Sequence, residues 1–105
     1  MDNQETTGRR AGTQEHRALG RAVREVRARR CLSQEELGFR AGLHRNYIGA
    51  IERGEINATF RTLLAVVKGL NLRLGVLIAV YERNLSEIHR PTMVAAADAA
   101  TQGGA

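Results

Sequence analysis

The sequence has little of the chemistry that metal sites and disulfides require. Its 105 residues include one cysteine, three histidines, one proline and no tryptophan. The single cysteine, Cys31, excludes an internal disulfide and a zinc site made of cysteines alone. The histidines, His16, His44 and His89, lie too far apart in the chain for metal-ligand spacing. With no phosphate-binding glycine loop either, we predict neither a metal site nor a cofactor.

Long apolar runs are also absent. No stretch of about 18 consecutive apolar residues occurs, so no membrane span and no membrane partner are expected. The polar N-terminus lacks the apolar region of a signal peptide. We therefore expect a cytoplasmic protein in which Cys31 stays reduced.

Lysine is nearly absent from a chain that is nevertheless basic. Of the 16 basic residues only Lys68 is lysine, and 11 acidic residues leave a net charge of +5. The excess is concentrated in residues 9–30, which hold eight Arg against two Glu. A basic segment suits nucleic acid or an anionic membrane surface, and a solvated arginine face is the simple alternative.

Few aromatic residues leave Leu, Ile, Val and Ala to build the core, and this composition favours an all-α fold. The folded domain is expected over residues 15–90, between a polar arm at 1–14 and an Ala/Gly-rich tail at 91–105. Apolar periodicity and cap residues predict five helices, at about 15–30, 33–42, 44–53, 59–69 and 73–84.

Local signals fix where two of these helices begin or end. Ser33 and Glu36 form a capping box, and Gly42 suits the left-handed turn that closes that helix. Thr59 is a plausible N-cap of the fourth helix. Its buried stripe is predicted to consist of Phe60, Leu63, Leu64 and Val67.

Residues 33–54 have the pattern of a helix-turn-helix: a capped helix, a tight glycine turn and a second short helix. The second helix is predicted to expose Arg45, Asn46, Gly49 and Ala50. Arginine can donate two hydrogen bonds to guanine, and asparagine can pair with adenine in the same way. Glycine and alanine would let the helix lie close to the bases. These four residues are therefore the candidate base contacts in a DNA major groove.

Four segments in order carry a resemblance to a known family: LGRAVREVR, LSQEELGFRAGL, NYIGAIERGE and LLAVVKGLNL. With them the chain resembles the Cro/CI-type (Xre-like) helix-turn-helix family, related to the lambdoid phage repressors. The resemblance covers roughly Leu19 to Leu77 and implies a compact five-helix, lambda-repressor-like DNA-binding domain. Within the family, the ERGE segment is most similar to small regulators without a second domain, such as restriction–modification controllers or Cro-like proteins.

The resemblance also implies roles for individual residues. Arg27 and Glu52 match an ion pair that joins the first helix to the end of the recognition helix. Cys31 stands where the family has a residue that tolerates a left-handed backbone, and His44 stands where Ser or Thr caps the recognition helix. His44 is interpreted as an imperfect cap or a phosphate neighbour, and Tyr47 as either core or a sugar–phosphate contact. The predicted phosphate contacts are Gln34, His44, Tyr47, Arg53 and Asn57.

The last predicted helix has apolar residues on more than one face. Val76 and Val80 widen its stripe, so they either complete the core or contact a second copy of the chain. We favour the homodimer, because one recognition helix reads too few base pairs and a two-fold dimer reads two half-sites.

These observations predict a sequence-specific, double-stranded-DNA-binding transcriptional regulator that acts as a dimer on a two-fold symmetric operator. The alternative is an adaptor or antitoxin whose main partner is another protein, because a fold alone does not fix function. No nucleophile with its base, no paired carboxylates and no ligand set are evident, so the chain is predicted not to be an enzyme.

Overall fold

The computed structural model describes residues 12–88, which form five helices and contain no strand. The helices are α2 (Gln14–Arg29), α3 (Gln34–Ala41), α4 (Arg45–Glu52), α5 (Phe60–Leu70) and α6 (Leu74–Ile88). The predicted all-α fold is therefore correct, and α6 continues past Asn84, its predicted end. Most of the predicted arm and the whole tail lie outside the described residues.

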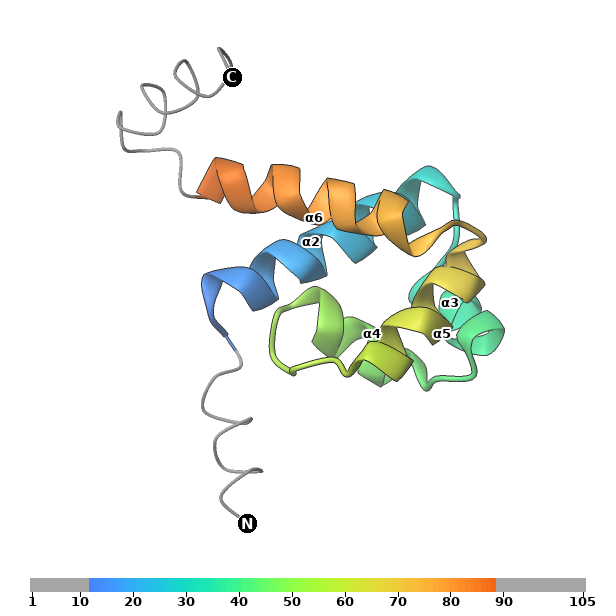
Figure 1. Cartoon of the computed structure of the whole chain (residues 1–105). Helices are drawn as coiled ribbons and strands as arrows, with labels where there is room; N and C mark the ends of the chain where they lie inside the picture. The colour runs from blue at the N-terminus through green and yellow to red at the C-terminus, as the bar shows by residue number, and fades with distance from the viewer. Residues whose placement is uncertain (1–11, 89–105) are drawn as a thin grey trace, which may run out of the picture.

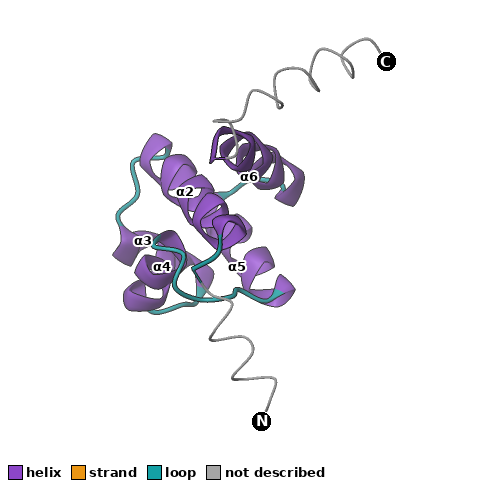
Figure 2. Cartoon of the chain, turned by 90° about the vertical axis from the view of Figure 1, so that its left-hand side faces the viewer, coloured by secondary structure: helices purple, strands orange, loops and turns teal. Residues whose placement is uncertain are grey.

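The helices form two groups (Figure 1). α2 and α6 run antiparallel, one beside the other, and α3, α4 and α5 lie together below them. Figure 2 shows the same division from the side, with α3 and α4 adjacent to each other and α5 next to them. α2 contacts α4 as well as α6, so it joins the two groups.

The core is aliphatic, as the composition predicts. Burial of these side chains is the main force that holds the five helices together, because most of the stability of a helix in a protein comes from packing of its apolar face. The largest completely buried side chains come from all five helices and are Val23, Leu37, Ile48, Ile51, Val66, Leu70 and Leu77.

Two residues of the stripe predicted for α5 lie on the outside. Phe60 and Leu64 are 64% and 43% exposed, whereas Val66, Val67 and Leu70 are buried. α5 is turned about its axis relative to the predicted orientation because it approaches α3 closely at Gly69. A Cβ added to Gly69 would lie only 2.8 Å from Leu37 Cδ1. This contact turns the Val66–Leu70 side of the helix inward. The prediction that Phe60 and Leu64 are buried is therefore wrong.

Cys31, in the turn between α2 and α3, has a left-handed backbone with φ of 57°. A side chain in this region is strained by about 1–2 kcal/mol. We expect Cys31→Gly to raise the free energy of unfolding by about 0.5–1 kcal/mol, since relief of strain outweighs the added freedom of glycine in the unfolded chain. Chemical denaturation measures the change. Cys31→Ala removes the thiol but keeps the strain, so an equal gain in Cys31→Ala would contradict the backbone explanation.

Candidate nucleic-acid interface

The helix-turn-helix is built from α3, a glycine turn and α4. The Ser33 backbone donates to Glu36 Oε1 at 2.7 Å, and the Glu36 backbone donates to Ser33 Oγ at 2.9 Å. Both hydrogen bonds of the predicted capping box are thus present. Gly42 closes α3 with φ of 74°, the left-handed conformation predicted for it. The capping box fixes where α3 begins, and Gly42 fixes where it ends and how the chain turns into α4.

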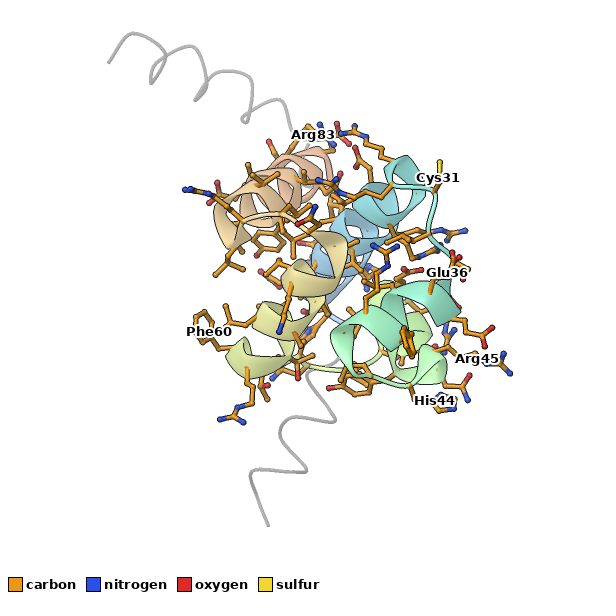
Figure 3. The ribbon with its side chains drawn as sticks, turned by 90° about the vertical axis from the view of Figure 1, so that its right-hand side faces the viewer. Cys31, Glu36, His44, Arg45, Phe60 and Arg83 are labelled. Carbon is orange, nitrogen blue, oxygen red and sulfur yellow. The ribbon has the colours of Figure 1, made fainter. Side chains whose placement is uncertain are left out.

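The N-terminus of α4 is exposed and carries the predicted base-contact residues Arg45 and Asn46. His44 caps the helix, because its Nδ1 accepts a hydrogen bond from the Asn46 backbone at 2.9 Å. Because Nδ1 accepts this hydrogen bond, Nε2 carries a ring proton that can be donated to another group. Figure 3 shows His44 and Arg45 on the same outer edge of the molecule. The Arg45 side chain is 60% exposed, and its one acidic neighbour among the described ion pairs is Glu35, at 3.8 Å.

The opposite end of α4 is fixed by a buried ionic network. Arg27 of α2 donates from Nε to Glu52 Oε2 at 2.6 Å and from Nη2 to Glu52 Oε1 at 3.0 Å. Arg27 Nη1 also donates to the Leu32 carbonyl at 2.8 Å. The Glu52 side chain is only 3% exposed. The hydrogen bond to Glu52 raises the pKa of Arg27, although burial acts against the charged form.

Gln34, a predicted phosphate contact, belongs to the same network. Its Nε2 donates to Glu52 Oε1 at 3.0 Å, and the residue is half-buried. A primary amide has two N–H groups, so one hydrogen bond to Glu52 is compatible with a second to a phosphate oxygen. The network therefore orients Gln34 while it holds the end of α4.

Gly49 does not lie on the exposed face predicted for it. The residue is buried, and a Cβ there would lie 3.1 Å from Arg53 Nη1 and 3.3 Å from Gln34 Oε1. Long side chains from α3 and from the end of α4 cover it. The prediction that Gly49 is exposed is wrong, and its small size instead makes room for Gln34. Ala50 and Tyr47 are half-buried, and Tyr47 packs against the core.

Arg53 and Asn57, the remaining predicted phosphate contacts, are exposed in and near the loop after α4. Arg53 forms two hydrogen bonds with Glu55, from Nε at 2.8 Å and from Nη2 at 3.2 Å. The hydrogen bond from Arg53 lowers the pKa of Glu55, so this carboxyl is ionised at neutral pH. Sequence reasoning missed Glu55, although an acidic residue two positions after an arginine is a visible signal.

Val76 and Val80, the predicted dimer contacts, line one open cavity of about 520 Å³. Val76 is 50% exposed, and Val80 is half-buried against the core. Three arginines, Arg29, Arg30 and Arg40, line the same cavity.

Residues 12–88 contain no group of three or more His, Cys, Asp or Glu side chains placed to hold a metal ion. No single helix in this range is long and apolar enough to cross a membrane. Together α5 and α6 meet that criterion, but they are bent by 104° relative to each other.

The fold and this site define a class of protein. A capped helix, a glycine turn and a short helix with an exposed, polar N-terminus make up a helix-turn-helix of the DNA-binding kind. A family model described as a helix-turn-helix matches residues 23–77, more than half of the chain, and the chain belongs to this family. This match and the five observed helices confirm the predicted family and fold.

Among similar proteins is the control protein C.SmaI of Serratia marcescens. It is 49% identical over 53 residues, which are 50% of this chain and 63% of that protein. The matched part thus spans just under two thirds of this relative.

Two solved structures of restriction-modification controller proteins are also similar. C.AhdI of Aeromonas hydrophila has a TM-score of 0.61 and 34% identity, covering 62% of this chain and 98% of its own. The C.Esp1396I tetramer, solved with its natural 35 base-pair operator, has a TM-score of 0.64 and 25% identity. That match covers 68% of this chain and 93% of the C.Esp1396I chain.

Proposed function

We propose that the protein is a sequence-specific regulator of transcription that binds double-stranded DNA as a dimer, with α4 in the major groove. The observation that carries this proposal is the asymmetry of α4. Its far end is held by the buried Arg27–Glu52 pair, whereas Arg45 and Asn46 project from its exposed start. A recognition helix needs both properties, because base readout requires donors in fixed positions on an accessible surface.

The residues around α4 divide into two roles. Arg45 and Asn46 contact base edges, and the half-buried Ala50 is small enough for a thymine methyl group to pack against it. The phosphate contacts surround them: the second amide N–H of Gln34, the Nε2–H of His44, and the side chains of Tyr47, Arg53 and Asn57. Such contacts fix the register of the protein on the duplex and carry no sequence information themselves.

The similar proteins support this assignment. C.SmaI is named a control protein, and the C.Esp1396I structure is described as a tetramer bound to its operator. We propose that this chain also acts on an operator as a symmetric assembly, within a restriction–modification system. It then works in the cytoplasm by occupying DNA, which requires no catalytic group.

Selection from a genomic fragment library at two salt concentrations tests the proposal. The wild-type protein should enrich a two-fold symmetric site, with affinity that falls steeply as salt rises. Arg45→Ala should lose about 1–3 kcal/mol of discrimination at one base position of each half-site. The matched control is Arg24→Ala, which removes an exposed arginine from α2 and should keep the sequence preference.

Two results would contradict the proposal. One is that the wild-type protein enriches no site, and the other is that Arg45→Ala binds every fragment as the wild type does. Binding that changes little with salt would then favour the adaptor or antitoxin alternative, in which the partner is another protein.

The Arg53–Glu55 pair gives a further prediction. Glu55→Gln should strengthen DNA binding to all sequences alike, because Arg53 is then released to a phosphate and a negative charge leaves the interface. The slope of log affinity against log salt should become steeper by about one unit. A salt titration measures both effects. Glu82→Gln, at an exposed position on α6, is the matched control, and an equal gain there would show a general charge effect instead.

A further inference from the structure

We propose that the cavity beside Val76 is a binding site for a small organic anion with an apolar body, such as a fatty carboxylate. The cavity is open and has a volume of about 520 Å³, within the range of small-molecule sites. It lies where the ends of α2, α3 and α5 meet the start of α6. Figure 1 shows the end of α2 and the loop between α5 and α6 on the same side of the molecule. The site is independent of the proposed function, because none of its residues is assigned to DNA.

The floor of the cavity is apolar and already formed by the fold. Leu32 follows the left-handed Cys31, with φ of 57°, and it lies just beyond α2. Leu72 follows the left-handed Asn71, with φ of 58°, just beyond α5. In both turns the backbone N–H of the leucine donates to the carbonyl five residues earlier, at 3.1 Å. This helix ending directs an apolar side chain back onto its own helix.

The two turns therefore build one surface. Its apolar residues are Val26, Leu32, Leu72, Val76 and Val80. Because backbone hydrogen bonds fix the two leucines in advance, a ligand does not have to order them when it binds. A preformed apolar floor is typical of small-molecule sites.

Three arginines, Arg29, Arg30 and Arg40, line the same cavity, and among residues 12–88 no carboxylate lines it. Within this range Arg30 and Arg40 have no ion-pair partner. Arg29 is paired with Glu25, but Glu25 also has Arg83 at 2.5 Å and keeps that partner when Arg29 turns to a ligand. A guanidinium group binds a carboxylate or phosphate through two parallel hydrogen bonds. The cavity thus offers positive charge beside an apolar floor, the complement of an amphipathic anion.

Two other hollows of the described chain lack this combination. The one beside Tyr81 has a volume of about 240 Å³ and an apolar lining, but it contains Glu15 and no described arginine. The one that Phe39 lines contains Glu35, and through Arg45 it belongs to the nucleic-acid interface. A carboxylate repels an anionic ligand in each of them. Of the three hollows, the one beside Val76 therefore suits an anion.

Val76 and Val80 are also the dimer contacts predicted from the sequence, so a ligand and a second copy would compete for them. A two-fold contact uses the same patch on both copies. Two such patches bring arginines from both sides and, among the described lining residues, no carboxylate to neutralise them. A small anion neutralises the arginines and covers the apolar floor at once.

A titration of octanoate into the full-length protein, followed by two-dimensional amide NMR, tests the site. The chemical shift changes should saturate and be largest at Leu32, Leu72 and Val76, and small at Tyr81. Acetate has the charge without the apolar body, and 1-octanol has the apolar body without the charge. Octanoate should bind at least about tenfold more tightly than either, because it alone satisfies both parts of the cavity.

Paired arginine variants test the recognition of the anion. Arg30→Gln/Arg40→Gln should raise the octanoate dissociation constant about tenfold or more, because two charge-assisted contacts are lost. The matched control is Arg21→Gln/Arg24→Gln, which removes the same charge from exposed positions of α2 that do not line the cavity. The control should stay within about twofold of the wild type, since distant exposed charges are screened by salt. Equal weakening in both pairs would reveal a general charge attraction and overturn the proposal.

Three further results would also overturn it. One is that 1-octanol binds as tightly as octanoate, and another is that the shift changes centre on Tyr81. The third is an octanoate dissociation constant that rises with protein concentration, which would show that a second copy covers Val76. Arg45→Ala should bind octanoate as the wild type does, so failure of this site and failure of DNA recognition are observed separately.

Discussion

Arg27→Leu should lower the free energy of unfolding by about 3–5 kcal/mol, which is much of the stability of a domain this small. The substitution removes three hydrogen bonds, two to Glu52 and one to the Leu32 carbonyl. The Glu52 carboxylate is then buried with Gln34 as its one remaining partner among the described hydrogen bonds. A buried charge without its counter-ion is far more costly than the loss of a surface pair. Urea denaturation measures the difference.

The chain provides a matched control on the same helix. Arg29 Nη2 and Glu25 Oε2 also lie 2.6 Å apart, but their side chains are 62% and 27% exposed. Glu25 in addition has Arg83 at 2.5 Å, so it keeps a partner when Arg29 is lost. Arg29→Leu should therefore cost less than about 1 kcal/mol. Equal losses in the two variants would show that burial does not set the strength of the Arg27–Glu52 pair.

A double substitution separates the charge from the packing. Replacing both Arg27 and Glu52 with leucine removes the buried charges together, so much of the loss in Arg27→Leu should be recovered. The recovered protein would be folded but would lack the bond that orients Gln34. Its DNA binding should then fall at all sequences, because Gln34 is proposed to position the protein on phosphate.

The sequence predicts those parts of the molecule that depend on neighbours along the chain. Ser33 with Glu36, Gly42 and Thr59 begin or end helices as predicted, because each cap is a bond or a conformation within a few residues. The left-handed backbone at Cys31 is local in the same sense. Fold class and the position of the helix-turn-helix follow from such signals.

The errors concern contacts between distant segments. The outward position of Phe60 and Leu64 depends on how closely α5 approaches α3 at Gly69, and apolar periodicity along α5 cannot report that distance. The burial of Gly49 depends on Gln34, which is 15 positions earlier and on another helix. Periodicity identifies which residues share a face, but packing decides which way the face turns.

The site therefore depends on contacts that hold one end of α4. α2 provides two of them: the Arg27 guanidinium on Glu52, and the close approach of Gly20 to the last turn of α4. No signal in the sequence identified Gly20. Both contacts are at the opposite end of α4 from Arg45 and Asn46. They therefore determine the position of these two residues without contacting DNA themselves.

Gly20→Ala should lower the free energy of unfolding by about 3 kcal/mol, at the upper end of the usual range for an overpacked core. A Cβ at this position would overlap the carbonyl oxygens of both Ile51 and Glu52, and it would lie 2.7 Å from the Glu52 carbonyl carbon. Backbone atoms cannot rotate away as a flexible side chain can. The strain outweighs the roughly 1 kcal/mol that alanine contributes in a helix. Thermal unfolding measures the net change.

The same substitution at Gly75 should have the opposite sign. Gly75 lies in α6, and a Cβ at this position would have no atom within 4 Å. Gly75→Ala therefore gains helix propensity, about 0.5–1 kcal/mol, without strain. A loss at Gly20 and a gain at Gly75 would attribute the effect to the α2–α4 contact. If Gly20→Ala were also stabilising, α2 would have room to move away from α4. The anchor of the recognition helix would then consist of the Arg27–Glu52 pair without the close packing beside it.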